Sequence, residues 1–173
     1  MTVLTRTGFV LVLAAALGGC SIGGLLGGGK PPATLVTLTP EAAAPELIAR
    51  NATAGQSVTI ETPTVPKELA FVRVPVQLTP TNVQYVANLQ LVDTPDRLFQ
   101  RLLEETVRRT TSRVVLDPAQ SALDPGIAVS GELQRFGYDA STGEVIVTYD
   151  AALSAPGSAG VHTRRFTARA PAD

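Results

Sequence analysis

The chain has 173 residues, of which 14 are basic and 15 acidic, so its formal net charge at pH 7 is −1. A balance this close to neutral excludes binding to nucleic acid or to anionic lipid by charge alone. The length suits one domain with a tether, and a single cysteine excludes a disulfide framework.

An apolar stretch that ends at this cysteine opens the chain. Arg6 precedes ten small or apolar residues at 8–17, and the sequence LGGC occupies 17–20. That length suits a secretory signal and is too short to span a bilayer. Small residues before a cysteine are typical of a lipobox, the site cut by the lipoprotein signal peptidase. The alternative is a signal peptide cut elsewhere, which would leave Cys20 as a free thiol.

The lipobox interpretation predicts how the chain is processed and where it is located. Residues 1–19 are a signal peptide, and the mature chain of 154 residues (173 − 19) begins at Cys20. Cys20 carries an N-acyl and an S-diacylglyceryl lipid, and we expect no other cofactor. Ser21 stands where an aspartate would favour retention in the inner membrane, so the outer membrane is predicted. Residues 20–33 are rich in glycine and proline and form a flexible linker.

Short strands are predicted from residue 34 to residue 92. Residues 34–38 form the first, and Ala42 to Arg50 could add a helical turn or two around Pro45. Residues 57–61 alternate and predict a half-buried strand. Residues 71–78 form another strand, which Pro75 places at a sheet edge or in a bulge. Residues 82–92 continue the alternation as one strand.

The best helix signal follows. Thr94 is a good N-cap, Pro95 suits the first helical position and Asp96 favours the positive helix start. Apolar residues then share one stripe of the helix. Glutamates and arginines four apart, at 104/108 and 105/109, form pairs worth roughly 0.2–0.5 kcal/mol each. We interpret the charged face as solvated, and a partner-binding face is the alternative.

The C-terminal third predicts an antiparallel meander. Residues 112–116 form a short strand, and a loop with two Asp-Pro turns follows. Strands are predicted at 127–133 and 144–153, with a bulge near 131–137 because the apolar phase reverses there. A last strand spans 161–169. The fold class is therefore α/β (α+β), with a mixed, largely antiparallel central sheet flanked by helices.

Signatures of catalysis are absent from the sequence. His162 is the single histidine and has no cysteine partner, so no typical zinc site is expected. Neither a nucleophile elbow nor a phosphate-binding glycine loop occurs. The carboxylates form no recognisable acid–base pair. We predict that the protein is not an enzyme.

Several segments together resemble the ABC-type transport auxiliary lipoproteins, the PqiC-like family. These are the lipobox, the sequence IETPTVP at 60–66, RVVLD at 113–117, VSGELQRF at 129–136 and the most specific one, LQLVDTPDRLFQRLLEET at 89–106. The resemblance covers nearly all of the domain at 34–173. Two features depart from the family: no tryptophan lies near Leu91, and the Ala-rich amphipathic helix that usually ends its members is missing. We therefore expect a truncated C-terminus and an apolar patch on one face of the sheet.

The resemblance implies an accessory role in transport of lipids or hydrophobic solutes across the envelope. The implied partners are an MCE-domain protein, an inner-membrane ABC permease with its ATPase, phospholipid and, through the anchor at Cys20, the membrane; nucleic acid is not one of them. The implied fold is similar to the amino-terminal domain of TolB. The strand at 71–78 is a hypothetical acceptor for a partner's strand. The alternatives are a structural or assembly lipoprotein of the envelope and a direct lipid carrier.

Overall fold

The computed structural model describes residues 34–45, 50–124 and 126–172. The predicted signal peptide, Cys20 and the linker lie outside these residues. The described elements are β1 (Thr34–Val36), β2 (Val58–Ile60), the 3₁₀ helix η3 (Lys67–Leu69), β3 (Pro75–Thr79), β4 (Asn82–Tyr85), β5 (Leu89–Leu91), α2 (Pro95–Thr110), β6 (Val115–Leu116), the 3₁₀ helix η4 (Pro118–Leu123), β7 (Ile127–Asp139), β8 (Glu144–Ser154) and β9 (His162–Pro171).

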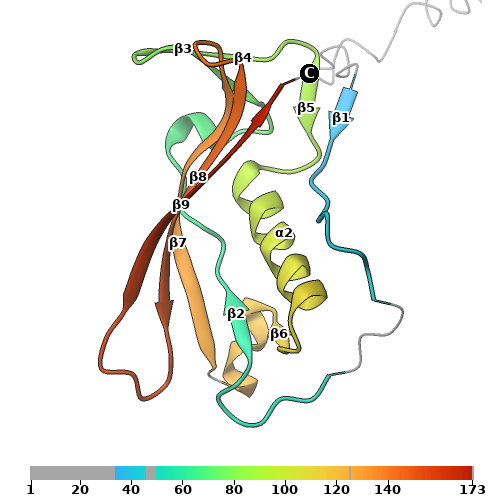
Figure 1. The fold of residues 1–173 in the computed structure, drawn as a ribbon, viewed down its shortest axis with the longest axis vertical. Coiled ribbons are helices and arrows are strands. Elements are labelled where there is room, and N and C mark those ends of the chain that lie inside the picture. The colour runs from blue at the N-terminus through green and yellow to red at the C-terminus, as the bar shows by residue number, and fades with distance from the viewer. Residues whose placement is uncertain (1–33, 46–49, 125, 173) are drawn as a thin grey trace, which may run out of the picture. The chain divides into compact units, whose positions relative to one another are not determined.

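The long strand β7 organises a seven-stranded mixed sheet (Figure 1). One edge of β7 pairs with β8 along its whole length, and β8 pairs with β9, so the predicted antiparallel meander is confirmed. Two strands share the other edge of β7. Parallel β2 pairs with its first residues, and parallel β3 pairs with its last. Strands β6 and β4 extend the sheet beyond β2 and β3, while β1 and β5 form a separate parallel pair.

Strand β7 also carries the predicted bulge. The pairing with β8 shifts register between Leu133 and Arg135, which leaves Gln134 as the extra residue. One extra residue exchanges the two faces of a strand. That exchange explains why Leu133 and Phe136 pack on the same core although their sequence phases are opposite.

The predicted helix is confirmed as α2, with Pro95 in its first turn and Thr94 as the N-cap residue. The cap differs from the expectation because the Thr94 side chain accepts no bond; instead, the Thr94 N–H donates to the Asp93 carboxylate at 2.8 Å. Both predicted ion pairs form, Arg108–Glu104 at 3.5 Å and Arg109–Glu105 at 2.7 Å. Much of the charged face is thus engaged within the helix.

Strand β2 is more buried than its alternation predicted. Val58, Thr59 and Ile60 are all buried, and so is Ser57. The reason is its position between β6 and β7, since central parallel strands are covered on both faces. On one of these faces the Gln100 side chain of α2 donates to the Ile60 carbonyl at 2.8 Å.

Two strand predictions before α2 were wrong in extent or position. The strand predicted at 71–78 begins only at Pro75, and β3 pairs with β4 and with β7, so it is not an edge. Pro75 is tolerated as the first residue of the strand. The strand predicted at 82–92 is two strands, because Asn88 adopts a positive φ of 57° and turns the chain between β4 and β5.

The helical turns predicted near residue 42 do not form where the structure describes the chain. Residues 41–45 are a bend and irregular chain, and 46–49 lie outside the described ranges. This segment lies against α2 instead, where the Arg109 side chain donates to the Ala42 carbonyl at 2.8 Å. The Arg50 guanidinium also donates to the carbonyl of Arg108 near the end of the helix.

The core lies between α2 and the meander. Leu69, Phe99, Leu133, Tyr149 and Ala151 form one buried cluster. The rings of Phe99 and Tyr149 meet at a centroid distance of 5.0 Å and an interplanar angle of 60°. Such tilted contacts stabilise a core beyond the area that they bury. The helix is therefore anchored on β7 and β8, whereas every residue of β9 is exposed.

Candidate docking surface

The described residues include few groups that could bind a metal or catalyse a reaction. No group of three or more His, Cys, Asp or Glu residues that could hold a metal occurs among them. Glu104 is a buried carboxylate, and burial raises its pKa although Arg108 opposes the shift. Its contacts are the side chains of Gln100 at 3.3 Å and Arg108, which tie it to its own helix. His162, at the start of β9, is exposed.

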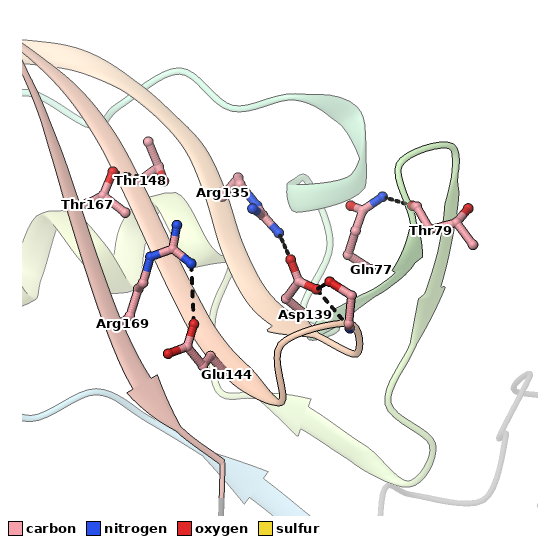
Figure 2. A network of polar contacts seen from close by, with 9 residues as sticks. Gln77, Thr79, Arg135, Asp139, Glu144, Thr148, Thr167 and Arg169 are labelled. Atoms are coloured by element: carbon pink, nitrogen blue, oxygen red, sulfur yellow. Dashed lines mark hydrogen bonds and ion pairs between the residues drawn. The ribbon is translucent and has the colours of Figure 1, made fainter.

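A polar network surrounds the turn between β7 and β8 (Figure 2). Arg135 points toward Asp139, and the guanidinium donates to the carboxylate at 2.9 Å. Ser141 donates to the same carboxylate through its hydroxyl at 2.6 Å and its backbone N–H at 3.0 Å. These bonds, first that of the Ser141 hydroxyl and then that of Arg135, lower the pKa of Asp139 from 3.8 to about 2. The network closes the hairpin and contains no nucleophile paired with a base.

This network predicts a dependence of stability on acid. A carboxylate with a depressed pKa stabilises the fold above its unfolded pKa, and the contribution is lost as the pH falls from 3.8 toward about 2. We expect Asp139→Asn to lower the melting temperature at neutral pH and to lose less further stability across this window than the wild type. Thermal melts followed by circular dichroism at several pH values check this. Glu61→Gln, at an exposed position, is the control, and equal acid sensitivity of Asp139→Asn and the wild type would contradict the assignment.

One side of the ten-residue strand β9 pairs with β8. Its other side has no partner strand among the described residues. The Ala172 N–H donates to the Gly143 carbonyl, which sets the phase of the ladder to β8. Hydrogen-bonded and non-bonded pairs alternate in an antiparallel ladder. The outward N–H and C=O groups therefore belong to Thr163, Arg165, Thr167 and Arg169. They offer a template for one more strand.

All the formally charged side chains of β9 are basic. The strand contains three arginines and no acidic residue. Arg165 holds the Asp150 carboxylate with two bonds, at 2.6 and 2.5 Å, and Arg169 lies 3.3 Å from Glu144 (Figure 2 shows the second pair). Arg164 instead stacks on the Phe166 ring, 5.0 Å from its centroid, and forms no ion pair within the described part of the chain. Two of the three arginines are thus paired with carboxylates of β8, and the charge of Arg164 remains to disfavour pairing with a second copy and to favour an acidic strand.

Beside this edge lies an apolar groove between α2 and the faces of β8 and β9. Its hollow measures about 510 Å³. Residues of α2 and of the four strands β2, β7, β8 and β9 line it, among them Phe99, Leu103, Val107, Val129, Leu153 and Phe166. Leu153 is 39% exposed and Phe166 47%, which is high for large apolar side chains on an inward-facing surface. Helix α2 packs on β2 and β6 and, through Phe99, on Tyr149 of β8, and the groove lies beside it toward β9.

The sequence predicted parts of this surface and missed others. It placed a partner-accepting edge at 71–78, whereas β3 is interior and the longest edge of the sheet among the described residues is β9. The signal for β9 was present, since residues 162–171 alternate and carry basic residues without acidic ones. Cys20, the predicted lipid attachment site, lies outside the described residues, so its role stays a prediction. None of the helices in the described ranges is long and apolar enough to cross a membrane.

The same fold occurs in two solved structures. One is the crystal structure of an uncharacterized protein, 16% identical, with a TM-score of 0.58 over 79% of this chain and 81% of the other. The second is a Xanthomonas campestris protein of the DUF330 family, 14% identical, with a TM-score of 0.61 over 80% and 78%. At such identities the likeness shows the fold alone, and this fold defines the class as a mixed α/β domain.

The sequence identifies the family within that fold. The family model described as ABC-type transport auxiliary lipoprotein component matches residues 37–173, and the chain belongs to this family. Membership implies a non-catalytic accessory role in an ABC-type transport system and a location in the cell envelope. No curated protein matches the sequence.

Proposed function

We propose that the protein is a lipid-anchored accessory of an ABC-type transport system that moves lipids or other hydrophobic solutes across the envelope. It faces the periplasm from the outer membrane and acts by anchoring and docking, without catalysis. Its partners are an MCE-domain protein and the inner-membrane permease with its ATPase. The family match supports the transport role, and the free basic edge of β9 carries the docking proposal.

The anchor is a triacylated Cys20, exposed as the first residue after removal of residues 1–19. Each buried methylene of an acyl chain contributes about 0.8 kcal/mol, and more than one chain gives stable attachment. The linker at 20–33 contains five glycines and two prolines. A flexible chain of this length has an end-to-end distance of roughly 20 Å. The domain can therefore meet a partner at a small distance from the bilayer.

Docking occurs through strand addition at β9. An extended segment of a transport subunit would satisfy the outward backbone groups of Thr163, Arg165, Thr167 and Arg169. Acidic side chains on that segment would complement the arginines, because opposite charges on adjacent strands attract. Main-chain bonds of this kind supply affinity, and the alternating side chains supply specificity.

A pull-down from detergent-solubilised envelopes tests both the lipid anchor at Cys20 and docking at β9. The baits are the wild type, Cys20→Ala, Thr167→Pro and Thr167→Val. The wild type is expected to carry a triacyl mass on Cys20 and to recover transporter subunits or an MCE-domain protein. Cys20→Ala is expected to lack the acyl mass and to keep its leader uncut. Thr167→Pro removes one outward N–H and keeps the ladder to β8, so partner recovery should fall about tenfold, whereas Thr167→Val should bind as the wild type does.

Other results would overturn the proposal. A wild-type protein without acyl mass would remove the anchor. Equal recovery by Thr167→Pro and the wild type would remove strand addition at β9. A lipidated bait that recovers only assembly or cell-wall proteins would replace the transport role with that of a structural or assembly lipoprotein of the envelope.

A further inference from the structure

A small sheet beside the N-terminal end of α2 exposes one of its faces. Strand β5 lies at its centre, and β1 pairs with one edge of β5 (Figure 1). On the other edge the Leu91 N–H donates to the Val72 carbonyl at 2.9 Å. Leu91 is buried and Val72 is half-buried, so both side chains point to the covered face. Because side chains alternate along a strand, the residues next to these two point outward.

Three large apolar side chains lie on the outward face. Leu35 of β1 pairs with Gln90, two positions before Val92, and Phe71 directly precedes Val72. The exposed fractions are 60% for Leu35, 56% for Phe71 and 53% for Val92. Side chains at paired and diagonal positions of neighbouring strands are within reach of one another. The three therefore form one apolar patch, called the β5 face below, and a clustered patch of this kind marks a site of interaction.

A positive charge lies on the same side. Arg73 is two residues from Phe71, and its guanidinium lies 5.5 Å from the centre of the Tyr85 ring. Arg73 forms no ion pair within the described ranges. The nearby carboxylate of Asp93 is paired with Arg101 at 2.8 Å. Apolar side chains with an arginine and a tyrosine beside them match the boundary between the acyl chains and the anionic headgroups of a bilayer.

The predicted linker enters the domain at this face. Residues 20–33 lead directly into β1, whose second residue is Leu35. A flexible chain of this length has an end-to-end distance of roughly 20 Å, so an anchor at Cys20 holds Leu35 close to the bilayer. The far end of the domain is held less closely, because α2, about 24 Å long, separates β5 from β6 and η4. A tether makes the contact intramolecular, so a weak apolar face is enough to bind.

We propose that the β5 face lies on the surface of the bilayer that carries the anchor, with Leu35, Phe71 and Val92 in the headgroup boundary and Arg73 against lipid phosphates. The domain then has a fixed orientation, with η4 directed away from the bilayer. This goes beyond the proposed function, in which the linker leaves the orientation free, and rests on the anchor at Cys20 to bring the domain to a membrane. No lipid leaves the bilayer in this contact.

The absence of tryptophan and the single cysteine make a direct test possible. The chain 20–173, produced without its leader, is coupled through Cys20 to a maleimide-bearing phospholipid. The vesicles contain equal parts of phosphatidylcholine and phosphatidylglycerol. The compact unit at 32–173 contains the whole β5 face. Leu35→Trp and Leu123→Trp each replace an exposed leucine by the single fluorophore of the chain, the first on the β5 face and the second in η4.

The two tryptophan variants are expected to differ on the vesicles. The emission of Leu35→Trp should move to shorter wavelength and be quenched by brominated acyl chains, because an indole at this face enters the headgroup boundary. The emission of Leu123→Trp should stay as it is for the uncoupled chain and remain unquenched. The degree of quenching of Leu35→Trp then measures the ratio of docked to undocked domain.

Three further substitutions are made in the Leu35→Trp chain. Phe71→Ser should lower the ratio of docked to undocked domain about tenfold, since a large apolar side chain is lost from the contact. Val161→Ser is the matched control, because Val161 is 63% exposed and lies directly before β9; it should leave the ratio unchanged. Arg73→Gln should lower the ratio about fivefold on these vesicles and have no effect on phosphatidylcholine alone.

Three results would overturn this assignment: an unquenched Leu35→Trp, equal quenching of Leu35→Trp and Leu123→Trp, or equal effects of Phe71→Ser and Val161→Ser. In the first case, protection of the fluorophore from aqueous iodide in a concentrated sample of the chain would assign the β5 face to a second copy. Protection that requires solubilised envelopes would assign it to a protein partner.

This proposal and the proposed function fail separately. A missing acyl mass on Cys20 in envelopes would remove the natural anchor and leave the quenching of the chemically coupled chain as it is. An unquenched Leu35→Trp would remove the membrane contact of the β5 face and leave the anchor and partner recovery at β9 in place.

Discussion

Leu133→Ala should lower the free energy of unfolding by about 2–5 kcal/mol, the range for truncating a buried leucine. Leu133 is 0% exposed and lies in the middle of β7, just before the bulge. It packs in the cluster that joins η3, α2 and β8 through Leu69, Phe99 and Tyr149. Truncation would leave a cavity among three elements that cannot all move inward, because β7 is held by strands on both edges.

Urea denaturation of the wild type and the variant measures this loss. Leu123→Ala is the matched control, since Leu123 is 78% exposed in η4 and its truncation should change stability by less than about 0.5 kcal/mol. Equal losses in the two variants would contradict the packing around Leu133. A change in the slope of the transition would indicate a change in the surface exposed on unfolding, and the two variants would then be compared by their midpoints.

Gly131→Ala should be a second strongly destabilising substitution, with a cost of about 1–3 kcal/mol or more. A Cβ atom at Gly131 would collide with the Asp150 carbonyl oxygen and would lie 2.9 Å from the Tyr149 ring. The carbonyl is backbone of the paired strand β8, so it cannot move without opening the ladder. The ring is held by its hydroxyl bond to Ser130 and by the contact with Phe99.

Gly160→Ala is the control for this substitution. A Cβ at Gly160 meets no atom within 4 Å, so the same chemical change is tested there without a collision. Thermal and urea denaturation should show a large loss for Gly131→Ala and little change for Gly160→Ala. A wild-type-like Gly131→Ala would mean that β7 and β8 are farther apart near Tyr149 than the structure has them.

The sequence predicted well those elements whose signals lie within one short segment of the chain. Helix α2 combines a capping position, Pro95 in its first turn, an apolar stripe and ion pairs four residues apart, all within one segment. The hairpin of β7 and β8 likewise follows from alternation and turn residues. The reversal of phase predicted a bulge near 131–137, and the structure places it at Gln134. These features were predictable because each depends on neighbours in the sequence.

Predictions that depended on distant partners were less reliable. Residues 71–74 alternate as well as β3 does, yet no long strand pairs with them, and the strand begins at Pro75. The expected edge at β3 is interior because β7 is long enough to pair with both β2 and β3 on one side. Asn88 carries no signal strong enough to divide the alternation that surrounds it, although its positive φ ends β4 and begins β5 as separate strands.

Some features of the candidate sites can likewise be predicted from the sequence, and others need the tertiary structure. The lipobox at Cys20 and the family are properties of the sequence, because a peptidase and a family model both act on the order of residues. The apolar patch expected on one face of the sheet rests on the resemblance and stays a prediction. The position of the groove beside α2, and the stacking of Arg164 on Phe166, required coordinates.

The sequence by itself determined the fold class, the helix α2, the antiparallel meander, the absence of catalytic signatures and the family. Only the tertiary structure decided which strands are the edges of the sheet, which strand is buried on both faces and where the groove lies. The physical reason is that a residue's own preferences act over a few neighbours, whereas an edge or a groove is defined by which distant segment does or does not pack there. Helix α2 packs on β2, on β6 and, through Phe99, on Tyr149 of β8, whereas every residue of β9 is exposed.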